Sequence, residues 1–511
     1  MVRDLFKKPV FIFILIFFCY LIGLWNLSIP LTGDQKVYLS IALEMFEKNQ
    51  WIIPSLFNEP NFLKPPFQYW ATIIGWKVFG VSVFGALLPS VLALIGSAFT
   101  VFELGKKLKL KSPLVAAVLF SSTIGSMTYG STAQMEIWIV FFYLLAWLAV
   151  LHAEIYLAYI LVGLMALVKG PLYPVLWTMS YLVWDLKKIK TRKFWVALIL
   201  GTAIGLSWYF LAAMTNKTEM LNQFLYSENF AKIHTQQGTI FQLWSEFIIS
   251  LFPWILILIF GMFQESNRER WKQNQKFYLS YGLLSMIFFT FFPYRVNSYL
   301  YFLTPIAAMM ASEVELEFSK RKWVAFLYGV IFSILLFVVL RFCQSGWFGY
   351  ELWIGVLGVS VVFLVANFKG WMSYVAIASL LLVNMIRISG VQIGEKDIAG
   401  LREIVHHHPG EYSYFINSRD YWHEFGLISA GLGKSVQRIY KVEEIDSFLA
   451  QGGFVILAED QSINKMDQLK CFNWNRLKRR TKFPFEKLLK ENVNFGEQEI
   501  TRTYKVCTSS Q

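Results

Sequence analysis

A small set of charged side chains in this sequence could bind a phosphate group and move a proton. Two acids, Asp34 and Glu136, each stand at the start of a predicted helix. Three cations, Lys64, Lys169 and Arg295, lie between apolar runs. Lysine binds phosphate oxygens as a point charge and arginine through its planar fork, whereas a carboxylate can accept a proton from a hydroxyl group. These residue types predict a site for a phosphate-bearing ligand beside a general base.

Each of these residues also has a simpler structural explanation. Asp34 could cap the helix that it opens, and Glu136 could interact with a helix dipole. Lys64 precedes two prolines and could anchor the chain at a membrane surface. The chemical interpretation gains weight from number and position, because both acids and several cations are predicted on one side of a membrane.

The composition predicts a membrane protein. The chain has 511 residues, of which 56% are hydrophobic and only 16% are charged, whereas soluble domains hold roughly 25% charged residues. In a soluble protein, the formal net charge of +13 would suggest a nucleic-acid partner. Here the basic residues lie mostly between apolar runs, where they orient a protein in the bilayer. We therefore expect membrane lipids as partners, and no nucleic acid.

Apolar runs recur through the first three quarters of the chain. A bilayer crossing needs roughly 20 apolar residues, so the runs predict a polytopic α-helical membrane protein with about thirteen spans. The run at 68–80 carries Lys77 and is predicted to lie in the interface plane. The predicted spans cover residues 9–27, 86–105, 113–130, 137–151, 155–168, 171–185, 194–214, 245–263, 277–292, 298–312, 324–341, 350–366 and 371–388.

The distribution of basic residues predicts the orientation in the membrane. Alternate connections are rich in lysine and arginine, and the positive-inside rule places them in the cytoplasm together with the N-terminus. An odd number of spans then puts the C-terminal part outside. We predict a transmembrane domain at 1–388, with a first outer loop at 28–85, and an extracytoplasmic domain at 389–511.

The predicted outer domain has the pattern of a small α/β module. Residues 412–417 and 454–458 read as buried strands, and residues 443–450 as a helix. A disulfide bridge between Cys471 and Cys507 is plausible only if this domain faces an oxidising compartment.

Several motifs, in order along the chain as far as Pro305, resemble those of a known group of enzymes. The sequence is similar to membrane glycosyltransferases of the aminoarabinose transferase and protein O-mannosyltransferase type, which have the GT-C fold. The motifs are Gly33-Asp34-Gln35, Lys64-Pro65-Pro66, Thr132-Ala133-Gln134-Met135-Glu136, Leu167-Val168-Lys169-Gly170-Pro171, Ser227-Glu228-Asn229-Phe230-Ala231-Lys232, Pro253-Trp254 and Tyr294-Arg295 followed by Tyr299.

The resemblance implies transfer of a sugar from a polyprenyl-phosphate donor to an acceptor on the outer face of the cell inner membrane, with inversion at the anomeric carbon. Asp34 would be the catalytic base, and Glu136 would position the acceptor or the sugar. The donor phosphate would be bound by Lys64, Lys169, Lys232 and Arg295. The residues expected to position the substrates are Gln35, Glu228, Asn229, Tyr294 and Tyr299.

Two departures from the family pattern concern the acids. The first motif of the family usually reads Asp-Glu, whereas Gln35 takes the second place here. The second motif usually ends in Asp, whereas this chain has Glu136. Both residues keep hydrogen-bonding capacity and Asp34 keeps its charge, so we expect an active enzyme. The sugar and the acceptor, either a glycolipid such as lipid A or a protein, stay open.

Neither a metal nor another cofactor is expected, because lysine and arginine can neutralise a single donor phosphate. The tract His406-His407-His408 could hold a metal, but the following Pro409 and the lack of acidic neighbours favour a loop. A transporter or flippase of polyprenyl-linked sugars would also need cations and apolar grooves, yet the sequence lacks the inverted repeats typical of transporters. A catalytically inactive scaffold would have no need of Asp34 and the cations.

Overall fold

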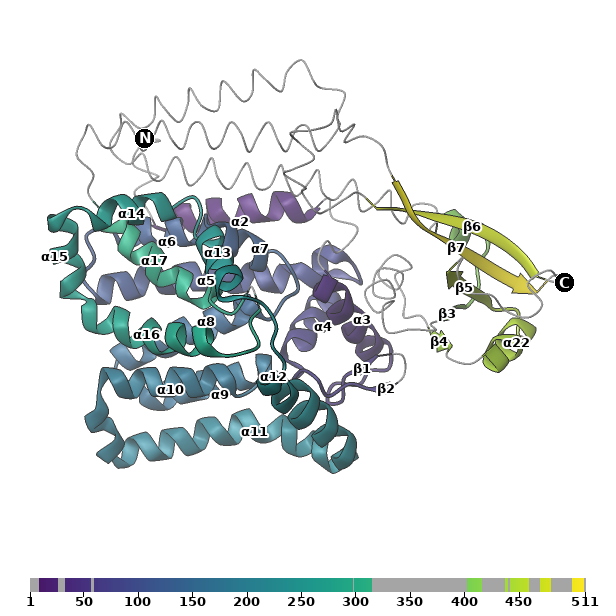
Figure 1. Ribbon diagram of the computed structural model, residues 1–511, viewed down its shortest axis with the longest axis horizontal. Coiled ribbons are helices and arrows are strands. Elements are labelled where there is room, and N and C mark those ends of the chain that lie inside the picture. Colours follow the sequence, from purple (N-terminus) through teal and green to yellow (C-terminus); the bar gives the residue numbers. More distant parts are fainter. Residues whose placement is uncertain are drawn as a thin grey trace, which may run out of the picture.

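The computed structural model describes residues 9–25, 33–56, 59–296, 298–314, 401, 403–415, 437–439, 442–458, 469–478 and 499–509. The last three predicted spans, at 324–341, 350–366 and 371–388, lie outside these residues. Figure 1 shows helices gathered in one part of the molecule and most of the strands at the other end.

The first outer loop forms a compact helical unit. It follows α2 (Pro9–Trp25) and consists of α3 (Gly33–Glu47), the short antiparallel pair β1 (Ser55–Leu56) and β2 (Glu59–Pro60), and α4 (Phe67–Phe79). Val37, Ile41 and Met45, which follow helical spacing, are 6%, 2% and 1% exposed. The predicted helix at Asp34 is therefore confirmed, and its apolar face is buried.

Most predicted spans in the described part of the chain coincide with single helices. Helix α11 continues past a break at Asn216 into η2 and α12. The helices that coincide with predicted spans include α5 (Val83–Lys107), α8 (Glu136–Leu151), α9 (Ile155–Lys169), α10 (Leu172–Trp184), α11 (Arg192–Met220) and α16 (Gln275–Phe291). The elements between or after them are η1 (Leu186–Lys190), η2 (Leu221–Phe230), α12 (Ala231–His234) and α15 (Glu265–Gln273).

Three predicted spans are divided. The run at 113–130 forms α6 (Pro113–Ser121) and α7 (Ile124–Tyr129), because Thr123 leaves the helix and its hydroxyl caps the next one by accepting from Ser126 N. The run at 245–263 contains α13 (Ile240–Ser250) and α14 (Ile255–Met262), which are bent by 100°. The run at 298–312 forms η3 (Tyr301–Leu303) and α17 (Thr304–Ser312). Apolar character alone did not reveal these breaks.

Two helices of the described residues, at Val83–Lys107 and Arg192–His234, are long and apolar enough to cross a membrane. The described residues contain a third candidate span if the bent pair α13 and α14 crosses the membrane as one unit. Shorter apolar helices are present at Pro9–Leu21, Glu136–Leu151, Ile155–Lys169 and Tyr301–Ser312. The structure therefore supports a helical membrane protein, and the number of about thirteen spans stays a prediction.

Helices α9 and α11 pack with their backbones close together. A Cβ atom on Gly201 would lie 2.4 Å from the carbonyl oxygen of Tyr159, and one on Gly163 would lie 2.5 Å from that of Gly201. A Cβ atom on Gly205 would approach Ala166 to 2.9 Å. Small residues at such positions allow close packing of membrane helices.

The C-terminal part contains a five-stranded mixed sheet in the order β4-β3-β5-β7-β6. The predicted strand at 454–458 and the predicted helix at 443–450 are present, and the strand expected at 412–417 is described as far as Phe415. The elements are β3 (Tyr412–Phe415), β4 (Gln437–Ile439), α22 (Val442–Ala450), β5 (Phe454–Ala458), β6 (Leu469–Lys478) and β7 (Glu499–Ser509).

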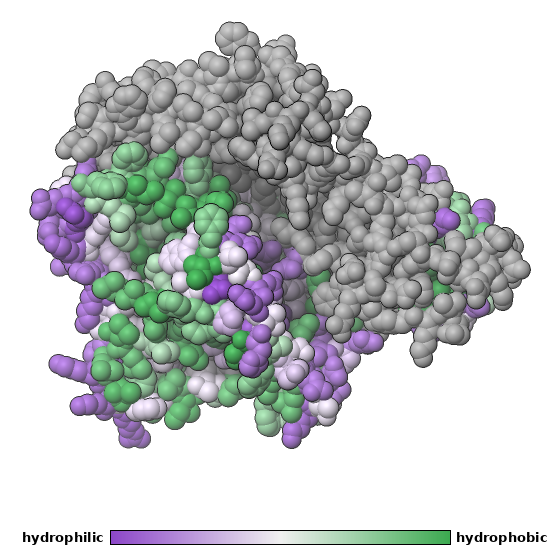
Figure 2. Space-filling view, viewed as in Figure 1, coloured by the Kyte–Doolittle hydropathy of each residue, from purple (hydrophilic) through white to green (hydrophobic). Residues whose placement is uncertain are grey.

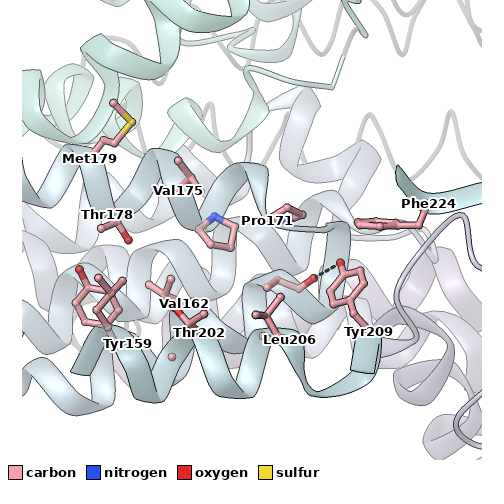
Figure 3. Close-up of a pocket in the computed structure, with 16 residues that line it drawn as sticks. Tyr159, Val162, Pro171, Val175, Thr178, Met179, Thr202, Leu206, Tyr209 and Phe224 are labelled. Atoms are coloured by element: carbon pink, nitrogen blue, oxygen red, sulfur yellow. Dashed lines mark hydrogen bonds between the residues drawn. The ribbon is translucent and has the colours of Figure 1, made fainter. Parts of the chain in front are cut away.

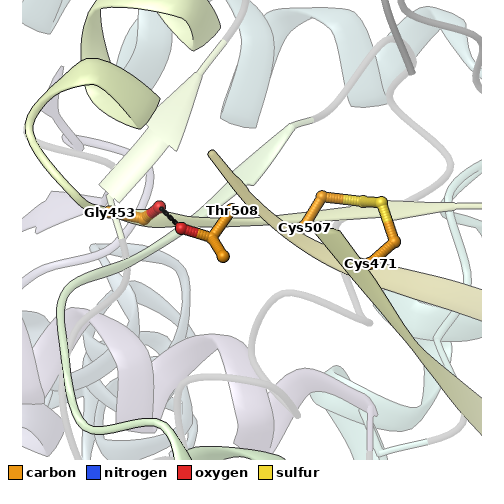
Figure 4. Close-up of a disulfide and its surroundings, with 4 residues drawn as sticks. All are labelled: Gly453, Cys471, Cys507 and Thr508. Atoms are coloured by element: carbon orange, nitrogen blue, oxygen red, sulfur yellow. Dashed lines mark hydrogen bonds between the residues drawn. A yellow bond between two sulfur atoms is a disulfide. The ribbon is translucent and has the colours of Figure 1, made fainter. Parts of the chain in front are cut away.

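Cys471 and Cys507 lie directly opposite each other on β6 and β7 and form a disulfide (Figure 4). Thr508, the next residue on β7, donates a hydrogen bond to the carbonyl oxygen of Gly453 at 3.2 Å, just before β5. The expectation of a loop at the histidine tract was wrong for His406 and His407, which end a helical stretch at 403–407.

Candidate active site

Hydrogen bonds join the first outer loop to α11 and η2. The indole of Trp208 donates to the carbonyl oxygen of Ile52 at 2.7 Å, and the backbone N–H of Phe62 donates to Gln223 Oε1 at 2.7 Å. Gln223 also donates through Nε2 to the carbonyl oxygen of Pro60 at 3.2 Å. These contacts hold Lys64, two residues after Phe62, against the helical segment that carries Glu228.

Lys64 and Lys232 share one carboxylate oxygen. The ammonium group of Lys64 donates to Glu228 Oε1, and that of Lys232 donates to the same atom at 2.5 Å. The side chains of Lys64, Lys232 and Glu228 are 19%, 21% and 17% exposed, respectively. Lys232 also lies over the ring of Tyr294, 4.9 Å from its centroid, in a cation–π contact. Three separate segments of the chain thus meet in one partly buried cationic cluster.

A second ion pair joins Lys169 to Glu136. The Lys169 ammonium group lies 2.6 Å from Glu136 Oε1, and it lies 5.7 Å from the centre of the Tyr299 ring. Tyr299 is 8% exposed, and its carbonyl oxygen accepts a hydrogen bond from the Tyr173 hydroxyl at 3.3 Å. Lys169 and Lys232 therefore each contact an acid and an aromatic ring, whereas Lys64 contacts the acid Glu228.

The phenol of Tyr38 lies close enough to Asp34, Glu136 and Glu228 for their charges to act on it. Burial raises the pKa of Tyr38 well above its ordinary value, and the negative charges of Glu136, Asp34 and Glu228 raise it further. Asp34 and Glu228 likewise raise the pKa of Tyr294, after the larger effect of burial. Three acids from separate parts of the sequence therefore act on one phenol.

The three lysines influence one another. Burial lowers the pKa of Lys64 to about 8; the negative charge of Glu228 opposes this shift, whereas the positive charges of Lys232 and Lys169 add to it. Lys169 is thus close enough to Lys64 for their charges to interact. The predicted phosphate-binding lysines are brought together by the fold.

Asp34 and Gln35 differ in their surroundings. Asp34 is exposed in the first turn of α3, whereas Gln35 is 1% exposed. Gln35 Oε1 and the hydroxyl of Tyr69 are buried without a hydrogen-bond partner among the described residues. Burial and the charge of Glu228 raise the pKa of Tyr69, so this phenol belongs to the same region. Buried polar atoms without partners are uncommon and are candidates for contact with a ligand.

Arg295 is placed beside the cluster but binds backbone. Its Nε and one terminal nitrogen donate to the carbonyl oxygen of Thr290 at 3.1 and 3.0 Å, and the other terminal nitrogen donates to that of Gly238 at 3.3 Å. Gly238 has a φ of +71°, and a Cβ atom there would lie 2.7 Å from the Arg295 carbonyl oxygen. Arg295 therefore joins the end of α16 to the loop after Lys232. The side chain of Asn229 lies outside the described residues.

An apolar groove of about 290 Å³ leads away from these charges. Its walls come from α9, α10 and α11, and Figure 3 shows Tyr159 toward one end and Tyr209 and Phe224 at the other. Pro171 also lines it, and a Cβ atom on Gly170 would lie 3.6 Å from the Tyr209 hydroxyl. The end with Tyr209 thus adjoins the turn after Lys169. From Leu198 to Tyr209, α11 lines about 16 Å of groove.

Sequence reasoning missed Tyr38, Tyr69 and Gln223. Tyr38 lies four residues after Asp34, and this spacing places both on one helix face. No comparable signal identifies Gln223, whose role depends on contacts with a distant loop. Within the described ranges, no group of three histidine, cysteine, aspartate or glutamate side chains could hold a metal ion.

Three comparisons show which known proteins this chain resembles. Residues 63–210 match the family described as dolichyl-phosphate-mannose-protein mannosyltransferase. The chain is 25% identical over 322 residues to an undecaprenyl phosphate-alpha-4-amino-4-deoxy-L-arabinose arabinosyl transferase of Serratia proteamaculans, covering 56% of this chain and 57% of that protein. A relative of the same name from Pectobacterium atrosepticum is 24% identical over 406 residues, covering 72% of this chain and 70% of that one.

The fold matches solved structures over almost its whole length. The crystal structure of ArnT from Cupriavidus metallidurans in the apo state has a TM-score of 0.70 at 16% identity, covering 98% of this chain and 97% of that one. The form bound to undecaprenyl phosphate has a TM-score of 0.69. The GT-C membrane fold is thereby shown, and the family resemblance read from the motifs is confirmed. The interpretation of the chain as a glycosyltransferase agrees with the family match and with the named relatives.

Proposed function

We propose that this chain, a glycosyltransferase of the GT-C superfamily, transfers a sugar from a polyprenyl-phosphate donor of the undecaprenyl type to a glycolipid acceptor such as lipid A on the outer face of the inner membrane. The observation that carries this proposal is the cluster of Lys64, Lys169 and Lys232 beside an apolar groove. Such a site suits a ligand that joins a phosphate to a long apolar chain. The names of the aminoarabinose transferase relatives support the donor class.

In the proposed reaction, the Asp34 carboxylate takes the proton from an acceptor hydroxyl. The hydroxyl oxygen attacks the anomeric carbon, the bond between that carbon and the donor phosphate oxygen breaks, and the phosphate leaves with the electron pair. Glu136, held by Lys169, positions the acceptor or the sugar. The exposed side chain of Asp34 is accessible to a second substrate, in keeping with the role of a base.

Negative charge grows on the departing phosphate, and the lysines stabilise it. Lys64 and Lys232 would exchange Glu228 for the phosphate, since a carboxylate and a phosphate compete for the same ammonium protons. Arg295 uses three of its five N–H groups for backbone contacts, which leaves one on each terminal nitrogen for the phosphate. The polyprenyl chain would lie in the groove between α9, α10 and α11.

The test uses membranes that contain the full chain and radiolabelled polyprenyl-phosphate sugars, including aminoarabinose and mannose donors. We expect label in the glycolipid fraction with wild type and a loss of at least about 100-fold with Asp34→Asn. Asp446→Asn changes an exposed acid on α22 and should transfer like wild type. Label that crosses vesicle membranes without covalent transfer would indicate a transporter instead. Equal transfer by Asp34→Asn would remove Asp34 as the base.

A further inference from the structure

A second and larger groove, of about 520 Å³, lies among α13, α14, α15, α16 and α17. This volume falls within the range of about 300–1,000 Å³ that is usual for small-molecule sites. The groove shares no lining residue with the groove of Figure 3. Neither the family motifs nor the proposed sugar transfer gives it a role.

The long walls of this groove are apolar. Ile255, Leu258 and Ile259 line it from α14, and Leu279 and Leu283 line it from α16. From Gln275 to Met286, α16 contributes about 16 Å of wall. Figure 2 shows hydrophobic side chains gathered over these helices beside the hydrophilic α15. The shape and lining suit an extended hydrocarbon chain.

Cations stand at one end of the groove. Arg268 and Lys272 line it from α15, with Trp271 between them in sequence. The Trp271 indole donates to the carbonyl oxygen of Met310 at 3.0 Å, which fixes the ring at the groove wall. The guanidinium group of Arg268 makes no hydrogen bond or ion pair with any residue that the structure describes, whereas its backbone N–H donates to the carbonyl oxygen of Gln264 within the helix.

Lys272 also has capacity for another anion. It pairs with Glu269 at 2.5 Å, but the two side chains are 62% and 59% exposed, and such surface pairs are weak. The combination of an unpaired guanidinium, an available ammonium group and an apolar channel is complementary to an amphiphile with an anionic head.

We propose that this groove binds an anionic glycerophospholipid, with an acyl chain between α14 and α16 and its phosphate at Arg268 and Lys272. The cation end belongs to a connection that the positive-inside rule places in the cytoplasm, so the lipid comes from the cytoplasmic leaflet. Helix α16 starts at this end and finishes at Phe291, shortly before Arg295. The cationic end of the lipid site therefore lies at the opposite end of α16 from the proposed donor site, and the lipid proposal does not depend on the sugar-transfer proposal.

Native mass spectrometry of the full chain, purified in detergent, tests the proposal. We expect phosphatidylglycerol to be retained at least about fivefold more than phosphatidylcholine with the same acyl chains, because only the former carries a net negative charge. The double variant Arg268→Gln with Lys272→Gln should lose this preference. The matched control Lys187→Gln with Lys188→Gln removes two cations from another predicted cytoplasmic connection, outside the groove, and should keep it.

A second variant tests the channel itself. Ala307 lines the groove from α17, and Ala307→Phe should fill it and reduce retention of both lipids while the melting temperature stays within a few degrees of wild type. Equal retention of the two lipids by wild type, or an unchanged preference in the Arg268 and Lys272 double variant, would overturn the proposal. Displacement of phosphatidylglycerol by substoichiometric undecaprenyl phosphate would also overturn it, because the occupant would then be the carrier lipid.

Discussion

Lys169 Nζ lies 2.6 Å from Glu136 Oε1, and the two side chains are only 14% and 12% exposed. Glu136 begins α8 and Lys169 ends α9. A helix N-terminus favours a negative charge and a C-terminus favours a positive one, so each helix stabilises its own charged residue. The pair therefore joins two neighbouring helices and fixes the position of the acid that we propose to position the acceptor or the sugar.

Removal of one partner of this pair should cost more than removal of both. Lys169→Met leaves the Glu136 carboxylate buried without its cation, a change that costs about 3–5 kcal/mol at well-buried sites. We expect a clear decrease in the melting temperature of the detergent-solubilised protein. The double variant Lys169→Met with Glu136→Gln should melt closer to wild type, although both variants should lose transfer activity.

Lys106→Met is the matched control for this pair. Lys106 contacts Glu103 at 2.9 Å on the surface, where an ion pair contributes about 0–1 kcal/mol. A double variant that melts no higher than Lys169→Met would show that the two residues do not stabilise each other.

Donor binding should weaken above about pH 8. The pKa of Lys64 is lowered to about 8, so this side chain is a cation below that pH and becomes neutral above it. Loss of one ammonium charge from a phosphate site should raise the Kd for undecaprenyl phosphate by about tenfold per pH unit, until the pKa of Lys64 in the complex is reached. Equilibrium binding between pH 7 and 10 measures this change.

Lys64→Arg should bind with little pH dependence over the same interval, because arginine keeps its charge. Lys217→Arg makes the same replacement at an exposed position near the end of α11 and should behave like wild type. If the binding curve of Lys64→Arg falls as steeply as that of wild type, another group causes the pH dependence.

The contact between α9 and α11 should be sensitive to a single methyl group. Gly201→Ala would place a Cβ atom 2.4 Å from the Tyr159 carbonyl oxygen, and backbone must move to relieve this clash. We expect a lower melting temperature and a weaker affinity for polyprenyl phosphates, because these helices form two walls of the groove. Ala203→Val enlarges an exposed residue on the same helix and should have little effect. A wild-type melting temperature for Gly201→Ala would show that the helices are not closely packed.

Cys471 and Cys507 should be inaccessible to thiol reagents in intact cells until a reductant is added. The two cysteines face each other on adjacent strands, and disulfides persist in oxidising compartments. Mass-spectrometric detection of alkylation, in a Cys19→Ser and Cys343→Ser background, gives the readout. Free thiols at both positions in freshly lysed cells would contradict the predicted extracytoplasmic location of this domain.

The sequence was sufficient to predict most of the helices. Long apolar runs predict elements such as α5, α8 and α16 to within a few residues, because membrane helices must satisfy their own backbone hydrogen bonds. The break at Thr123 and the bend between α13 and α14 were not predicted. Both depend on local hydrogen bonds and tertiary contacts, which hydropathy does not measure.

The composition of the candidate site was predicted better than its pairing. Lysines at 64, 169 and 232 were expected to bind phosphate, but the sequence could not show that Lys64 and Lys232 would share Glu228. Lys64 and Glu228 are 164 positions apart in the sequence, so only folding brings them together. The hydrogen bonds from Arg295 to backbone carbonyl oxygens could not be predicted from the sequence either, because the charge of the side chain suggested an anion as its partner.

The shared carboxylate of Glu228 has a consequence for discrimination among lipids. Phosphate headgroups far outnumber sugar-loaded carriers in any bilayer, and most of them would be attracted to bare lysines. Because Glu228 already contacts Lys64 and Lys232, an incoming headgroup gains only the difference between its own contact and the one that it displaces. A common phospholipid with no further complementarity gains little from this exchange, whereas a ligand that also fills the groove beyond Tyr209 gains apolar contacts in addition. Glu228 thus reduces the binding of abundant phospholipids to Lys64 and Lys232.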